Sequence, residues 1–141
     1  MNKKPRIVLD TNVLLVSISS KSEMHWIFQK LLQEEFELII SNEILLEYEE
    51  VISRKYSVEV ATAVIRTLLL LPNVIKSEIY FKWALLLSDV DDNKFVDCAV
   101  AANADYIVTH DKDFKPLEKV DFPSIEVVDI SGFKEILILW I

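Results

Sequence analysis

The chain has 141 residues, of which 52% are hydrophobic, and it contains one glycine and four prolines. This composition excludes a disordered or low-complexity protein, and the length suits one domain with a real core, which we expect to span residues 1–141. Its 15 basic and 23 acidic residues give a net charge of −8, so binding to nucleic acid through a general positive field is excluded.

The compartment is indicated by cysteine usage and by the lengths of the apolar runs. Cys98 is the only cysteine, so no internal disulfide can form, as is typical of a reducing compartment. No apolar run approaches the roughly 18 residues that cross a bilayer. The run after the basic N-terminus is broken at Asp10, too early for a signal peptide. We therefore expect a cytoplasmic protein that makes no use of a membrane.

The first half of the chain alternates strand-like and helix-like patterns. Either Thr11 or Asn12 is expected to cap the first helix, Ser41 is expected to cap the third, and Pro72 stops the fourth. The predicted strands span 6–9 and 36–40, and the predicted helices span 11–19, 22–34, 42–55 and 58–71.

The second half is less regular. Asn103 suits the left-handed position that ends a helix, whereas residues 80–88 fit a helix or a strand equally well. The run 136–141 is apolar on every side, which predicts either a buried segment or a partner surface. Further strands are predicted over 73–79, 105–109 and 125–128, and further helices over 93–102, 112–119 and from about 132. This order predicts an α/β protein with a mostly parallel sheet.

Acidic residues occur where predicted elements begin or end, or on the polar face of a helix. Asp10 and Asp111 each follow a strand, and parallel strands deliver such residues to the same edge of a sheet. Glu47 and Asp92 are the other two acids of this kind. Two carboxylates about 5 Å apart repel by roughly 3 kcal/mol at an effective dielectric constant near 20. Four together need a cation or bound protons, and oxygen ligands suit Mg²⁺ or Mn²⁺.

Each acid also has a plain structural interpretation. Asp10 and Asp92 can cap helices, Glu47 can lie on a solvated helix face, and Asp111 or Asp113 can belong to a turn. The neighbouring polar groups can bond a carboxylate or a bound water, or cap a helix; they are Thr11, Asn12 and Thr109, with His110 as a possible phosphate contact. The sequence contains no glycine-rich phosphate loop, no zinc-ligand spacing and no Ser-His-Asp arrangement.

Four stretches, in this order and at these separations, make the chain resemble a PIN-domain nuclease of the small bacterial toxin type found in toxin–antitoxin pairs. They are Leu9-Asp10-Thr11-Asn12, Ser41 through Glu47-Tyr48, Asp91 through Ala99, and Ala104 through Asp111.

The resemblance implies a three-layer α/β/α sandwich and an acidic pocket that binds Mg²⁺ or Mn²⁺ and cleaves RNA. It also implies a homodimer and an antitoxin protein as partner. By position, the catalytic and metal-binding acids are Asp10, Glu47, Asp92 and Asp111, and the secondary acids are Asp91, Asp97 and Asp113. Asn103 and His110 stand where glycine is common in similar proteins. Because the chain is acidic, RNA is expected to be held by metal and by a few of Lys21, Lys94, Lys112 and Lys115.

Two other functions remain open at this stage. The first is a catalytically silent PIN scaffold that docks a protein or RNA partner. The second is a phosphatase resembling the haloacid dehalogenases, but that chemistry requires an acid two residues after the nucleophile, where this chain has Asn12.

Overall fold

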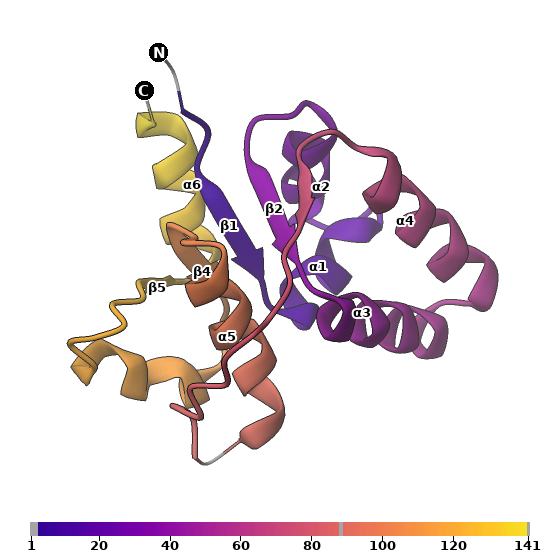
Figure 1. Ribbon diagram of the computed structural model, residues 1–141. Helices are drawn as coiled ribbons and strands as arrows, with labels where there is room; N and C mark the ends of the chain where they lie inside the picture. Colours follow the sequence, from indigo (N-terminus) through magenta and orange to yellow (C-terminus); the bar gives the residue numbers. More distant parts are fainter. Residues whose placement is uncertain (1–2, 88, 141) are drawn as a thin grey trace.

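The computed structural model describes residues 3–87 and 89–140, which form a five-stranded sheet in the order β3-β2-β1-β4-β5 (Figure 1). Every neighbouring pair of strands is parallel, which confirms the predicted sheet. The strands are β1 (Arg6–Leu9), β2 (Glu37–Ile40), β3 (Val74–Lys76), β4 (Tyr106–Val108) and β5 (Val127–Val128).

Helices cover both faces of the sheet. The chain runs from β1 to β2 and β3 on one side and then crosses to β4 and β5 on the other, so right-handed crossovers place helices on opposite faces. The α-helices are α1 (Thr11–Ile18), α2 (His25–Leu32), α3 (Asn42–Lys55), α4 (Val58–Leu70), α5 (Asn93–Ala101) and α6 (Ile130–Leu139). The short 3₁₀ helices are η1 (Val90–Asp92) and η2 (Lys112–Lys119).

Helix α5 packs against β1, β2 and β4, whereas α6 packs with α2 on the other face. There, the Phe133 ring of α6 lies edge-on to Phe36 at 5.1 Å and near Trp26 of α2 at 5.8 Å between ring centroids. The three-layer α/β/α sandwich is therefore confirmed. Within the described residues, no helix is both long and apolar enough to cross a bilayer.

Several local predictions are confirmed, each by a contact or a backbone conformation in the structure. The Ser41 hydroxyl accepts a hydrogen bond of 3.3 Å from the amide of Ile44 and so caps α3. Asn103 has a φ of 52°, the left-handed conformation that asparagine tolerates better than most residues. Helix α4 ends at Leu70, close before Pro72, which cannot continue it.

The predicted cap of the first helix is wrong. Asp10 occupies the N-cap position without a capping hydrogen bond from its side chain, and Thr11 and Asn12 lie inside α1. The reason is that the polar groups here are engaged elsewhere: Asp10 accepts a hydrogen bond from Thr109, and Thr11 donates one to Glu47.

Residues 80–87 form neither a helix nor a strand, which corrects the prediction that they form one or the other; residue 88 lies outside the described residues. This segment lies along α5, whose side chains take the backbone hydrogen bonds that a regular element would make internally. Asp97 accepts from the Trp83 amide at 3.0 Å, and Asn93 bonds both the amide and the carbonyl of Leu86 at 2.9 Å. We call residues 77–87 the strap.

The C-terminal apolar run is only partly buried. Ile136 and Leu137 are half-buried, whereas Ile138 and Leu139 at the end of α6 are 72% and 73% exposed. Residue 141 lies outside the described residues. Helix α6 begins two residues before the predicted start, because the Asp129 side chain caps it by accepting from the amide of Gly132.

Tyr48 connects the sheet to α3 and generates a prediction about stability. Its side chain is fully buried, and its hydroxyl donates a hydrogen bond of 2.5 Å to the Leu9 carbonyl, one residue before Asp10. Tyr48→Phe should lower the free energy of unfolding by about 1–2 kcal/mol, measured by urea denaturation, because a buried acceptor loses its donor. The control is Tyr56→Phe, at a residue that is 41% exposed, and equal unfolding midpoints for both variants would contradict the prediction.

Candidate metal centre and active site

Asp10 and Thr109 meet at the carboxyl edge of the sheet, between the parallel neighbours β1 and β4, where the strand order reverses. Leu9 pairs with Val108, so the next residue of each strand leaves the sheet at the same level. The Thr109 hydroxyl donates a hydrogen bond of 2.7 Å to Oδ2 of Asp10 and accepts one of 2.9 Å from the Asp111 amide. A single buried hydroxyl therefore connects the acids that follow the two strands.

Glu47 faces this edge from α3, and both of its carboxylate oxygens have partners. The Thr11 hydroxyl donates to Oε2, and the Lys94 ammonium lies 2.6 Å from Oε1. The side chains of Glu47 and Lys94 are only 23% and 13% exposed. Burial is the largest single effect on Lys94 and lowers its pKa, but the hydrogen bond to Glu47 and the charges of Glu47, Asp91 and Glu43 together outweigh burial, so the pKa of the lysine is raised. Glu47 is thus held in an ion pair rather than lying free on a solvated face.

The tightest group of acids in the described part of the chain differs from the four-acid set expected from the sequence. Ligand oxygens of four aspartates lie within 4.8 Å of one another; these are Asp89, Asp92, Asp111 and Asp113. Asp10 and Glu47 lie outside this group. Asp89 was missed because it lies at the N-cap of η1, and its place beside Asp111 and Asp113 depends on the packing of segments that are distant in sequence. The one available sequence signal was its position in the acidic run that ends at Asp92.

The crowding of acids raises carboxyl pKa values. Burial, followed by the charges of Asp89, Asp10 and Asp111, raises the pKa of Asp92 to about 8. Burial also raises the pKa of Asp10, although the Thr109 hydrogen bond acts in the opposite direction. The charge of Asp111 raises the pKa of Asp10, and the charges of Asp10 and Asp111 raise the pKa of Asp92. These three carboxyl groups therefore share one electrostatic environment.

The chemistry of this group fits a hard divalent cation. Oδ2 of Asp92 is buried and has no hydrogen-bond partner, so one carboxylate oxygen is left without a donor. Its neighbours supply only oxygen ligands, and Mg²⁺ and Mn²⁺ prefer carboxylate oxygen and water. Each carboxylate in the group disfavours ionisation of the others, and a bound cation would offset this repulsion.

Some of the remaining predicted site residues are accessible to a ligand or to solvent, and others have structural contacts. Asn12 and His110 line an open cleft of about 270 Å³ with Asp10 and Asp111, which leaves both residues available to a ligand. Asp91 is exposed beside Lys94 at 4.0 Å.

Asp97 has a structural contact instead. It is 5% exposed and accepts the Trp83 amide, so it holds the strap and does not join the acids. Among the lysines, Lys94 is engaged with Glu47, whereas the other three are exposed: Lys21, Lys112 and Lys115.

The family model described as the PIN domain matches residues 6–113, which include both strand ends and all of the acids above. The chain belongs to the PIN domain family. PIN domains form a family of nucleases, and the acidic edge of the sheet described here lies within the matched region.

Solved structures of PIN proteins share the fold at low sequence identity. VapBC2 from Rickettsia felis, bound to a DNA fragment from its promoter, has a chain 18% identical, with a TM-score of 0.61; the match covers 88% of this chain and 98% of that one. The sarcin–ricin-loop-cleaving toxin VapC20 of Mycobacterium tuberculosis is 16% identical, with a TM-score of 0.61, and the match covers 82% and 97%. The sequence matches none of the curated proteins with which it was compared.

The raised pKa of Asp92 predicts a pH-dependent cost in stability. The unfolded chain loses this proton near pH 3.8, whereas the folded protein keeps it to about pH 8, so stability falls as pH rises through that window. In EDTA, Asp92→Asn should raise Tm by about 4 °C at pH 8 and leave it unchanged near pH 4, measured by calorimetry. Asp91→Asn, at an exposed neighbour, is the control. A Tm difference that does not change with pH would contradict the assignment.

Proposed function

We propose that this PIN protein is a metal-dependent endoribonuclease that hydrolyses RNA phosphodiester bonds. The observation that carries the proposal is the buried, unpartnered oxygen of Asp92 among close carboxylates at the switch point of the sheet. Mg²⁺ or Mn²⁺ is the proposed cofactor. The residues proposed to hold it are Asp10, Glu47, Asp92 and Asp111, with Asp89 and Asp113 beside them.

Several residues of the chain would contribute to catalysis by binding and positioning. Asp10 is buried and Asp92 is half-buried, so a ligand held by them would be partly shielded from bulk water, and Thr109 fixes the carboxylate of Asp10 by a hydrogen bond. Lys94 neutralises Glu47, which limits repulsion next to a phosphate. When bound, a divalent cation supplies charge stabilisation and lowers the pKa of a water molecule for attack on phosphorus.

The biological role that we propose is that of a cytoplasmic toxin in a toxin–antitoxin pair. Support comes from the family and from the shared fold with VapBC2 and with a toxin that cleaves the sarcin–ricin loop. On this basis an antitoxin protein is the proposed partner, and a homodimer is the proposed assembly. The exposed apolar end of α6, with Ile138 and Leu139, is compatible with such an assembly.

One observation favours the alternative of a catalytically silent binding module. The ion pair between Lys94 and Glu47 satisfies this acid without any metal, as it would in a scaffold that no longer needs one. The two functions differ in an accessible quantity, since a nuclease of this type binds Mn²⁺ and a silent module does not.

Asp10→Asn tests the proposal. Asparagine keeps an oxygen that can accept from Thr109, so the fold should survive, but the charge that binds the cation is lost. The purified wild type should cleave members of a panel of structured and single-stranded RNAs in Mn²⁺ and none in EDTA. The variant should be about 10²–10³-fold slower. Full activity of pure, folded Asp10→Asn protein would rule out this site.

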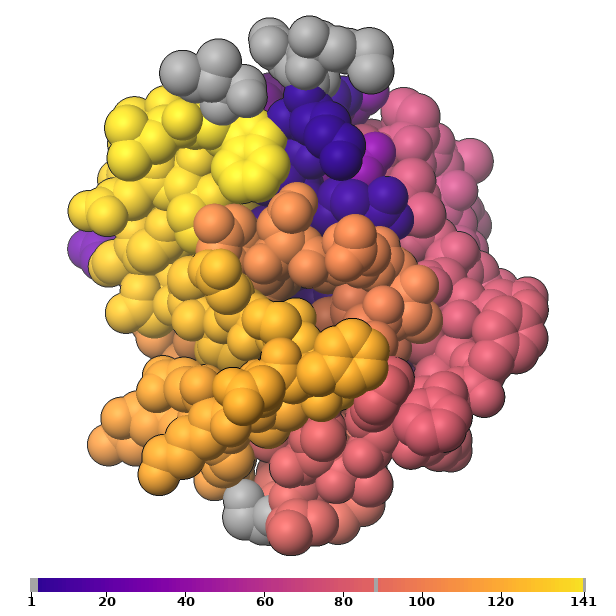
Figure 2. All heavy atoms as spheres, turned by 60° about the vertical axis from the view of Figure 1, so that its left-hand side comes forward, coloured from indigo at the N-terminus to yellow at the C-terminus, as the bar shows by residue number. Residues whose placement is uncertain are grey.

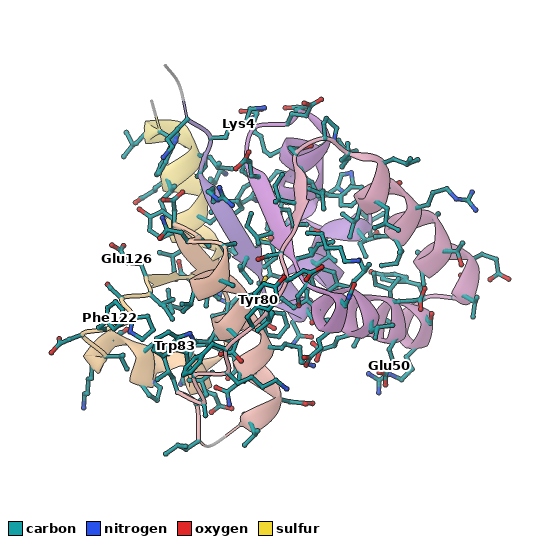
Figure 3. The ribbon with its side chains drawn as sticks, viewed as in Figure 1. Lys4, Glu50, Tyr80, Trp83, Phe122 and Glu126 are labelled. Carbon is teal, nitrogen blue, oxygen red and sulfur yellow. The ribbon has the colours of Figure 1, made fainter. Side chains whose placement is uncertain are left out.

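A matched pair of glutamates on α3 tests the role of Glu47. Glu47→Gln should weaken Mn²⁺ binding by about tenfold in a calorimetric titration, because a charged group near the cation is lost. Glu50→Gln should bind as the wild type does, since Glu50 projects from the outer side of the same helix (Figure 3). The absence of Mn²⁺ binding to the wild type would favour the silent module.

A further inference from the structure

Three aromatic rings gather on the surface where the strap meets the loop after η2. Phe81 and Phe122 are 62% and 81% exposed, and the half-buried Trp83 lies between them. Ring centroids are 4.7 Å apart for Phe81 and Trp83, and 6.0 Å apart for Trp83 and Phe122. Figure 3 shows Trp83 and Phe122 beside each other, and Figure 2 shows the two segments in contact on one face. We call these three residues the aromatic patch.

The strap holds the aromatic patch in place. Asp97 bonds the Trp83 backbone, Asn93 bonds the Leu86 backbone twice, and the Leu86 side chain is 1% exposed. Between these anchors Ala84 has a φ of 52°, a left-handed conformation that costs alanine about 1 kcal/mol. A conformation with such a cost persists only where its surroundings impose it. The strap residues of the patch, Phe81 and Trp83, therefore sit on a fixed part of the surface.

The strap also connects the patch to the acids. It leads to Asp89, which belongs to the tight group with Asp92. Asp89 comes six positions after Trp83, so the Cα atoms of the two residues lie at most about 20 Å apart. Lys82 of the strap lines a cleft of about 280 Å³ together with Lys94, and the acids Glu43 and Asp91 line it too.

The net charge of the molecule limits how an RNA could be held at the patch. A net charge of −8 repels a polyanion, so a substrate RNA needs contacts that do not depend on the general field. Stacking of bases on aromatic faces is such a contact, and a lysine interleaved with rings is typical of surfaces that bind single strands. Lys82 lies between Phe81 and Trp83 in the sequence and is exposed. Burial raises the pKa of Asp97 and the charge of Lys82 acts to lower it, so the ammonium lies towards the cleft beside the rings.

We propose that Phe81, Trp83 and Phe122 form a stacking platform for unpaired bases of the substrate RNA, with Lys82 contacting its backbone. The platform leads a single strand along the strap towards the acids at Asp89 and Asp92. This inference rests on the proposed nuclease function and specifies that the enzyme grips unpaired nucleotides beside the scissile bond.

The test measures binding of a short fluorescein-labelled oligouridylate by anisotropy in EDTA, where no cleavage occurs. The double variant Phe81→Ala/Phe122→Ala should bind about tenfold more weakly, because two exposed stacking faces are removed. Phe81→Leu/Phe122→Leu should lose nearly as much, since it keeps apolar area but no aromatic face. Tyr56→Ala, an exposed aromatic at the end of α3, should bind as the wild type does. The salt dependence should be shallow, because few phosphates are neutralised.

Cleavage in Mn²⁺ by the same proteins separates this inference from the proposed function. If the wild type cleaves RNA and needs Asp10, the alanine double variant should show a raised KM with an unchanged kcat. Wild-type affinity and KM in that variant would overturn the stacking platform and leave the nuclease standing. Full affinity in the leucine variant, with loss in the alanine variant, would also overturn it and assign the patch to apolar docking of a protein. A wild type that binds oligouridylate through the rings without cleaving any RNA would refute the nuclease and support the platform.

Discussion

The candidate site depends on the hydrogen bonds of one hydroxyl group, that of Thr109. It donates to the carboxylate of Asp10 and accepts from the amide of Asp111, so it orients the residues that follow both central strands. It can do so only because β1 and β4 are parallel neighbours with Leu9 opposite Val108. The pairing of two strands about 100 residues apart in sequence is therefore the constraint that assembles the acids.

Electrostatic repulsion between the gathered carboxylates destabilises the fold, and two local features of the chain reduce this repulsion. Two carboxylates about 5 Å apart repel by roughly 3 kcal/mol at an effective dielectric constant near 20. Asp92 avoids part of this repulsion by keeping its proton to about pH 8, and Glu47 avoids it through the ammonium of Lys94. A divalent cation entering the group would displace the proton of Asp92, so its binding and the ionisation of the site are coupled.

The sequence predicted what depends on local pattern and missed what depends on packing between distant segments. The strands, most of the helices, the Ser41 cap and the left-handed Asn103 follow from residue types and spacing, and all were confirmed. The strap was not predictable, because its backbone is satisfied by side chains of α5 rather than by a repeating pattern. Asp89 and the pairing of Lys94 with Glu47 were missed for the same reason, whereas the roles of the four motif acids stay predictions.

Under the function proposed here, the strap would allow an acidic protein to be specific for a polyanion. Repulsion by the general field weakens all non-specific binding, so whatever RNA does bind must be selected by local contacts. In this proposal the rings of the aromatic patch would supply contacts that require unpaired bases, and the group of acids would require a cation before a phosphate could approach. Because paired bases cannot stack on the rings, the proposed platform would also restrict the substrate to RNA segments that are already unstacked.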